Sequence, residues 1–271
     1  MRWRLQFGYD GSNFHGWASQ PNLRTVEGEI IQALVAARIV PSATGHLEVA
    51  SRTDRGVSAR ANALALESPL APRALLRILN GTAPDLWFTA AVPFPRPRSI
   101  RSALGRTYRF FEQATDLDLA KYREAARTLV GKVDVRSIGR GIPASAPVWR
   151  SVHRMTVRPA RGGAVVEVEA PSFVWGMVRK MVGACREVGA GRLPVERLRR
   201  AVQGKERLTL PMAEAEPLML WEVRYPDPWA VVWRGPNRHQ EREAARVRGW
   251  AQARSAVWAT LGEGIGPESL G

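Results

Sequence analysis

The sequence predicts an α+β fold built from two units of similar make-up. The chain has 271 residues, which is enough to bury a substantial core as one large domain or two small ones. Both halves contain segments of alternating apolar and polar residues, typical of strands, together with single segments of helical period. A proline-rich stretch with Pro93, Pro95 and Pro97 lies between the halves. The pattern alone does not choose this arrangement over other α+β arrangements.

The same pattern divides the chain into three expected parts. Residues 1–98 and 99–226 would be the two α+β halves, and residues 227–271 a C-terminal extension. Large side chains recur every three or four positions in the Ala-rich part of this extension, namely Val247, Trp250, Arg254, Trp258 and Leu261. This spacing predicts an amphipathic terminal helix that packs on the body or on a second subunit.

The charge of the chain indicates a partner that carries phosphate. Lys and Arg total 40 against 25 Asp and Glu, a formal net charge of +15. Basic surfaces gain affinity for nucleic acids by releasing counterions. The charge does not identify the partner, because Arg-rich composition can also follow from base composition or from a hot habitat.

Several classes of protein are disfavoured by what the sequence lacks. Its one cysteine, Cys185, lies in an apolar helical pattern, so we expect a buried thiol and no intrachain disulfide. The four histidines show no metal-ligand spacing, so we expect no metal site. No long apolar run or signal-peptide pattern is present, which predicts a cytoplasmic protein that does not span a membrane.

The first elements can be read in order from the N-terminus. Residues 2–9 alternate strictly and predict a half-buried strand that ends at the turn dipeptide Asp10-Gly11. Thr25 predicts the N-cap of a helix in which Val26, Ile30 and Leu34 recur at helical spacing.

Between the predicted strands at 46–50 and 61–66 lies a polar turn with one acidic residue, Asp54. Arg52 and Arg55 flank it, and Gly56 allows a backbone with positive φ that would present Asp54 outward. Neighbouring positive charge favours the ionised form of a carboxyl group. An ionised, positioned Asp can act as a base or nucleophile. From the spacing alone, a connecting turn with solvated charges is the other interpretation.

The remaining elements follow the same rules. A helix is predicted from Pro72 to a cap at Gly81, and another from 117 to 130 with a cap at Gly131. A helix beginning near Phe173 and one over 194–203 follow later. Strands are predicted at 86–92, 106–112, 151–158, 164–170 and 218–225.

Several stretches resemble the TruA-type tRNA pseudouridine synthases. The sequence SRTDRGVSA at residues 51–59 is similar to the family's RTD-x-GV-x-A signature, and residues 9–17 to its YDG-x-x-F-x-GW opening. Residues 172–183 resemble its SF-x-x-x-MVR-x-MVG helix. Shorter similarities lie at 25–28, 106–110 and 218–225, so the resemblance covers roughly residues 3–226.

The chain also departs from the family pattern. Ser58 stands where bacterial members carry His, as in the archaeal and eukaryotic branches. Residues 131–137 lack the His and both Phe of the family's G-x-HDF-x-SF segment. Pro217 replaces a Gly before Leu218, which leaves the backbone there open.

The resemblance implies a role for each site residue. Asp54 would be the nucleophile, Arg179 its ion-pair partner, and Arg52 the residue that fills the space of a flipped base. The implied substrate-binding residues are Tyr108, Leu218, Arg55, Phe14 and Trp17. Without the resemblance, Tyr108, Phe14 and Trp17 would be core aromatics and Arg179 a solvated helix residue.

The resemblance further implies two similar α/β-sandwich halves with antiparallel sheets joined around a basic cleft, and a homodimer. It implies isomerisation of uridine to pseudouridine in tRNA without cofactor or metal, most typically at anticodon-arm positions 38–40. Relatives with the RTD-x-GVSA form also modify other positions. A non-catalytic RNA-binding protein or chaperone is an alternative. A hydrolase that uses Asp54 is weaker, because the sequence shows no water-activating base or metal cluster to serve it.

Overall fold

The structure is a computed structural model that describes residues 1–40, 47–113, 116–143, 145, 147–160, 162–229 and 231–232. Met1–Trp233 form one compact unit, and Arg234–Gly271 form a second unit that lies outside the described residues. The amphipathic helix predicted near the C-terminus therefore also lies outside them. The boundary predicted at residue 98 stays a prediction.

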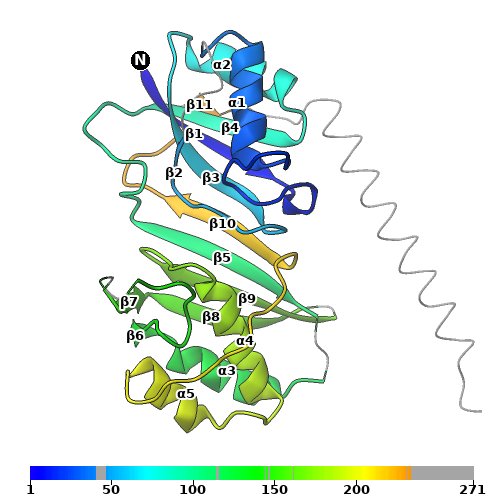
Figure 1. Cartoon of the computed structure of the whole chain (residues 1–271), viewed down its shortest axis with the longest axis vertical. Coiled ribbons are helices and arrows are strands. Elements are labelled where there is room, and N and C mark those ends of the chain that lie inside the picture. Colours follow the sequence, from blue (N-terminus) through cyan, green and yellow to red (C-terminus); the bar gives the residue numbers. More distant parts are fainter. Residues whose placement is uncertain are drawn as a thin grey trace, which may run out of the picture. The chain divides into compact units, whose positions relative to one another are not determined.

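One mixed sheet runs through the described unit and confirms the α+β class (Figure 1). Its N-terminal part contains β1 (Arg2–Tyr9), β3 (Ser58–Glu67) and β4 (Leu86–Pro93), with β1 in the middle. The short strands β2 (Glu48–Val49) and β11 (Val231–Val232) pair with β3 and β4. All of these pairs are antiparallel.

The C-terminal part of the sheet contains β10 (Leu218–Arg224), β5 (Gly105–Glu112), β9 (Gly163–Ala170) and β8 (Arg154–Ala160), in that spatial order. These strands are antiparallel to one another. The two parts meet at β3 and β10, which pair in parallel through Met219 with Ser58 and Leu220 with Ala59. The last long strand of the described chain, β10, thus lies between β3 and β5 and connects the two parts of the sheet.

The helices follow the same division in Figure 1. The helices α1 (Val26–Ala36) and α2 (Pro72–Thr82) accompany the N-terminal strands. The helices α3 (Leu119–Thr128), α4 (Met177–Gly189) and α5 (Val195–Val202) accompany the C-terminal strands, beside a two-stranded sheet of β6 (Gly131–Asp134) and β7 (Trp149–Val152). A 3-10 turn, η1 (Gly11–Asn13), follows β1. None of the described helices is long and apolar enough to cross a membrane.

Local chemistry explains the start of several of these elements. The Thr25 hydroxyl accepts a hydrogen bond from the Gly28 N–H at 3.2 Å, which confirms the predicted N-cap of α1. Pro72 occupies the first turn of α2, where its missing N–H costs nothing. Trp3, Leu5, Phe7 and Tyr9 of β1 are buried, as predicted, but Arg4 on the other face is fully buried as well, so the strand is not half-buried.

Several predicted boundaries were wrong. Gly131 does not cap α3, which ends at Thr128, but begins β6. Gly81 lies inside α2, which ends at Thr82, instead of capping it. The predicted strand 151–158 is divided between β7 and β8, which belong to different sheets. The helix predicted from Phe173 begins only at Met177, because Gly176 adopts a left-handed conformation with φ of 70°. Residues 172–176 therefore form a loop before α4.

The core is continuous across both parts of the sheet. Cys185 is fully buried in it, as predicted, and burial raises the pKa of its thiol far above the ordinary value. A thiol of this kind stays protonated and unreactive at neutral pH. Among the described residues, no group of three His, Cys, Asp or Glu side chains could hold a metal ion.

Candidate active site

The turn that carries Asp54 is held by hydrogen bonds to residues of β1, of β3 and of the segment after β1. The Thr53 and Tyr9 hydroxyls form a hydrogen bond of 2.7 Å. The backbone N–H of Trp17 donates to the Thr53 carbonyl at 3.0 Å. The Asn62 side chain donates to the Ser51 carbonyl at 2.8 Å. Burial raises the pKa of the Tyr9 phenol far above its ordinary value, so this anchor stays neutral. These hydrogen bonds fix the backbone on both sides of Asp54.

Glycine is required at two positions near this turn. Gly56 has φ of 83°, and the tight turn closes when the Val57 N–H donates to the Asp54 carbonyl at 3.1 Å. A side chain at Gly11 would place its Cβ only 2.3 Å from the Val57 carbonyl. The turn after β1 and the Asp54 turn can pack this closely only because Gly11 has no Cβ.

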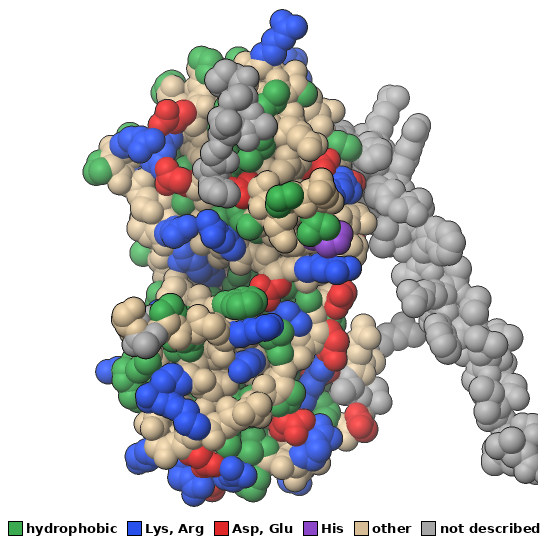
Figure 2. All heavy atoms as spheres, in the orientation of Figure 1, with side chains coloured by type: hydrophobic (Ala, Val, Ile, Leu, Met, Phe, Trp, Pro, Cys, Tyr) green, Lys and Arg blue, Asp and Glu red, His purple; other side chains and the backbone are tan. Residues whose placement is uncertain are grey.

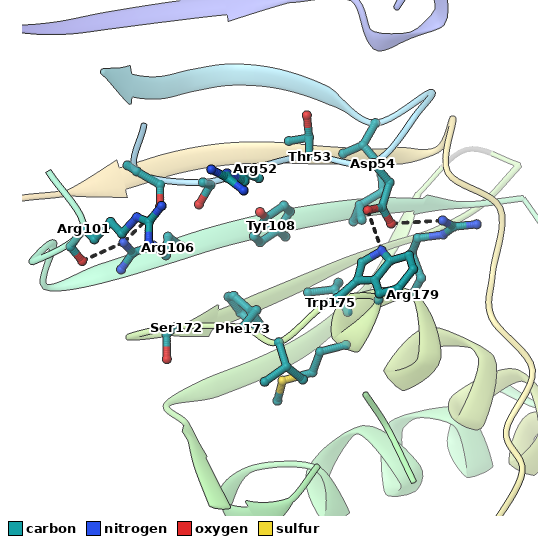
Figure 3. Close-up of a pocket in the computed structure, with 18 residues that line it drawn as sticks. Arg52, Thr53, Asp54, Arg101, Arg106, Tyr108, Ser172, Phe173, Trp175 and Arg179 are labelled. Atoms are coloured by element: carbon teal, nitrogen blue, oxygen red, sulfur yellow. Dashed lines mark hydrogen bonds and ion pairs between the residues drawn. The ribbon is translucent and has the colours of Figure 1, made fainter. Parts of the chain in front are cut away.

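Asp54 receives a donor on each of its two carboxylate oxygens (Figure 3). Arg179 Nη1 lies 3.2 Å from Oδ2, and the Trp175 indole N–H donates to Oδ1 at 3.0 Å. The Arg179 Nε–H donates to the Ala213 carbonyl at 2.7 Å, which orients the guanidinium. The Asp54 side chain remains 28 % exposed, so it is held in place and still reachable.

Asp54 and Arg179 open onto a pocket of about 550 Å³, a size typical of small-ligand sites. Tyr108 lines it and meets Phe173 edge to face, with ring centroids 5.3 Å apart. Leu218 adds an apolar wall. Burial is the main cause that raises the pKa of the Tyr108 phenol, so this side chain is also neutral at physiological pH.

Arg106 joins the pocket wall to both parts of the sheet. Its guanidinium is buried and donates to the carbonyls of Ala50 at 3.1 Å, of Arg101 at 2.8 Å, and of Pro171. A buried charge is tolerated when hydrogen bonds satisfy it. Arg106 therefore has a structural task, unlike the exposed arginines at the pocket mouth.

Arg52 and Arg101 are exposed residues of the pocket lining. Two more exposed arginines lie next to pocket residues, Arg140 over the Trp175 ring and Arg55 beside Asp54 in the sequence. None of them has an ion-pair partner among the described residues, whereas many other arginines are paired with Glu or Asp. In the described part of the chain, positive charge without an ion-pair partner is therefore present near Asp54, on a molecule whose visible face carries many Lys and Arg side chains (Figure 2). It is the arrangement expected where phosphate groups bind.

The structure brings together most of the residues predicted for the site. Arg52, Asp54, Tyr108, Arg179 and Leu218 all line one pocket, although they come from sequence positions far apart. This placement is compatible with their expected roles, which stay predictions.

Phe14 and Trp17 lie elsewhere. They are 2 % and 1 % exposed and are absent from the pocket lining. Phe14 contacts Tyr9 edge to face and Trp17 packs on Phe7. Core packing, the alternative considered for these two residues, accounts for this placement, and contact with RNA finds no support in it.

Trp175 is a residue of this pocket that was not predicted from the sequence. The helical pattern assigned it to a helix, where an exposed aromatic has no evident task. Only its spacing, four residues before Arg179, could have suggested that both residues reach one group.

Comparisons with known proteins identify the relatives of this chain. A family model described as tRNA pseudouridine synthase matches residues 125–226. A protein of Pyrococcus horikoshii named tRNA pseudouridine synthase A is 38 % identical over 228 residues, covering 83 % of this chain and 85 % of that one. The protein of the same name from Thermococcus kodakarensis is 37 % identical with the same coverage. The one from Methanosphaerula palustris is 35 % identical over 262 residues, 92 % of each chain.

These relatives are more than 30 % identical and the matches cover more than four fifths of each chain. The chain belongs to the tRNA pseudouridine synthase family. It is thus an enzyme of the isomerase class that acts on uridine in tRNA.

Proposed function

We propose that this chain converts uridine to pseudouridine at anticodon-arm positions 38–40 of tRNA, with Asp54 as the nucleophile. The observation that carries the proposal is the Asp54–Arg179 pair in a pocket whose exposed arginines, Arg52 and Arg101, have no ion-pair partner among the described residues. The pair supplies an oriented anion, and the arginines supply contacts for the RNA backbone. The positions 38–40 rest on the resemblance of the RTD motif.

The chemistry needs no co-reactant. The N1–C1′ bond of uridine breaks, the uracil rotates, and a C5–C1′ bond forms. C5 then loses its proton and N1 gains one, so that substrate and product are isomers. Asp54 would stabilise the separated state by bonding to C1′ of the ribose or to C6 of the uracil. Arg179 holds the carboxylate in position through its contact with Oδ2.

The uracil must leave the base stack before it can reach Asp54. Extruding a base costs a few kcal/mol. Arg52 is exposed at the pocket mouth and can offset part of this cost by filling the vacated space. Inside the pocket Tyr108 and Leu218 would enclose the base, where stacking on an aromatic side chain is worth roughly 1–3 kcal/mol.

The affinity for tRNA should fall steeply with salt. Phosphate neutralisation releases counterions, so log affinity should decrease linearly with log salt concentration. Arg55→Ala should make the slope shallower by roughly 0.7–0.9, the change expected for one lost phosphate contact. The measurement is a filter-binding titration at several salt concentrations.

A matched control for this titration is Arg192→Ala. Arg192 is exposed and paired with Glu187 at 2.7 Å, and it does not line the pocket. Its loss should leave the slope unchanged. A flat dependence for the unmodified protein would contradict a role for the basic surface in tRNA binding.

The modified positions can be tested directly. We expect purified protein to form pseudouridine at positions 38–40 of unmodified tRNA transcripts, and transcripts with cytidine at these positions to remain unmodified. Pseudouridine-specific chemical mapping is the measurement. Modification only at other positions would support the same chemistry with a different specificity. Binding without any modification would support the non-catalytic alternative.

We extend the proposal to a homodimer, for which the family resemblance is the support. Light scattering should give twice the mass of one chain.

A further inference from the structure

We infer that Trp175 is a positioning residue for Asp54, and that its indole N–H fixes the orientation of the nucleophilic carboxylate. The inference rests on the proposed function of Asp54. It assigns a task to a residue that the sequence pattern had placed in a helix.

The geometry of the carboxylate shows why a second donor is needed. Arg179 reaches only one oxygen, Oδ2, at 3.2 Å, while its Nε–H is used by the Ala213 carbonyl. Rotation about the bond to an Asp carboxylate is soft, so a single contact leaves the carboxylate plane undefined. The Trp175 N–H on Oδ1 at 3.0 Å adds a second anchor and fixes that plane.

Both donors come from one short segment of chain. Trp175 lies in the loop before α4 and Arg179 in its first turn, with Gly176 between them at φ of 70°. This left-handed residue turns the chain so that the indole and the guanidinium approach Asp54 together (Figure 3). The loop conformation that shortens the helix therefore serves the site.

Trp175 is itself held in place, although it is 54 % exposed. The Arg140 guanidinium lies 4.6 Å from the centre of its ring. The backbone N–H of Arg140 also donates a hydrogen bond to the backbone carbonyl of Trp175 at 2.9 Å. A Cβ at Gly141 would lie 3.2 Å from the indole, so the ring rests directly on this backbone. Arginine over an indole face is an attractive cation–π arrangement.

Burial of apolar surface does not account for this placement, because more than half of Trp175 is in solvent. A hydrogen bond to a charged acceptor is stronger than one between neutral groups. The indole has a single N–H, and it is aimed at the carboxylate and not at solvent. The hydrogen bond to Asp54 therefore explains the orientation of the Trp175 side chain.

The test compares Trp175→Phe with the unmodified protein in single-turnover kinetics. Phenylalanine keeps an aromatic ring for Arg140 but has no N–H. We expect the rate of pseudouridine formation to fall about tenfold, equivalent to about 1.4 kcal/mol of transition-state stabilisation. The affinity for tRNA and the melting temperature should stay close to those of the unmodified protein.

Trp149→Phe is the matched control. Trp149 is 41 % exposed and also carries a cation, Lys132 at 5.4 Å, but it does not line the pocket. Trp149→Phe should form pseudouridine at the wild-type rate. Trp175→Leu removes both ring and N–H; if positioning is the task of Trp175, its rate should match that of Trp175→Phe.

Two outcomes would overturn the inference. One is that Trp175→Phe forms pseudouridine at the wild-type rate. The other is that only Trp175→Leu is impaired and that its defect is weaker tRNA binding, which would make Trp175 a stacking surface for RNA. Failure of the proposed function has a different signature. In that case the unmodified protein would form no pseudouridine, or Asp54→Asn would form it at the normal rate.

Discussion

Asp54→Asn is expected to abolish pseudouridine formation while tRNA binding stays nearly unchanged. The amide has almost the shape of the carboxylate, and its carbonyl oxygen can still accept the Trp175 N–H. It lacks the negative charge that a nucleophile needs. Loss of a covalent nucleophile in other enzymes lowers turnover by up to about a millionfold, and we expect at least a roughly thousandfold loss here. The measurement combines single-turnover kinetics with a binding titration.

Asp116→Asn is a suitable control for this substitution, because Asp116 is exposed and lies outside the pocket. The chemical change is the same, so the control separates loss of charge at the site from loss of charge in general. Substantial pseudouridine formation by purified Asp54→Asn would contradict the nucleophilic role.

Arg179→Met is expected to damage catalysis far more than folding. Methionine preserves helix propensity and apolar bulk in α4, but it removes the positive charge from Asp54 Oδ2. Removing one such electrostatic contact from an active site costs about 100- to 1000-fold in turnover. The hydrogen bond from Arg179 Nε–H to the Ala213 carbonyl is lost as well. A hydrogen bond of this kind contributes about 1 kcal/mol to the free energy of unfolding. We therefore expect the melting temperature to fall by only about 2–4 °C.

Arg186→Met provides the contrasting case on the same helix. Arg186 pairs at 2.8 Å with Glu112, whose side chain is 1 % exposed, and at 2.6 Å with Glu214. Breaking a buried ion pair costs about 3–5 kcal/mol. This variant should therefore be clearly less stable, while its folded fraction turns over normally. If Arg179→Met kept the unmodified turnover, the ion pair with Asp54 would have no catalytic part.

The elements that the sequence predicted well are those set by local periodicity. The alternation in residues 106–112 reports which side chains face the core, and β5 follows it closely. In β1 the predicted apolar face is buried, but Arg4 and Gly8 of the other face are buried too. The cap at Thr25 is likewise local, because its hydroxyl bonds a backbone N–H three residues away. The boundaries at Gly81 and Phe173 were wrong because glycine and apolar spacing do not state which conformation a residue takes.

The sequence by itself determined the α+β class, the positions of these strands and, through the RTD motif, the acidic residue on which the site depends. Tertiary structure alone decided the parallel junction of β3 with β10, the burial of Phe14 and Trp17, and the two donors on Asp54. Those donors lie 121 and 125 residues from Asp54 along the chain. Local periodicity reports which face of an element is buried, and it carries no information on which distant element covers that face.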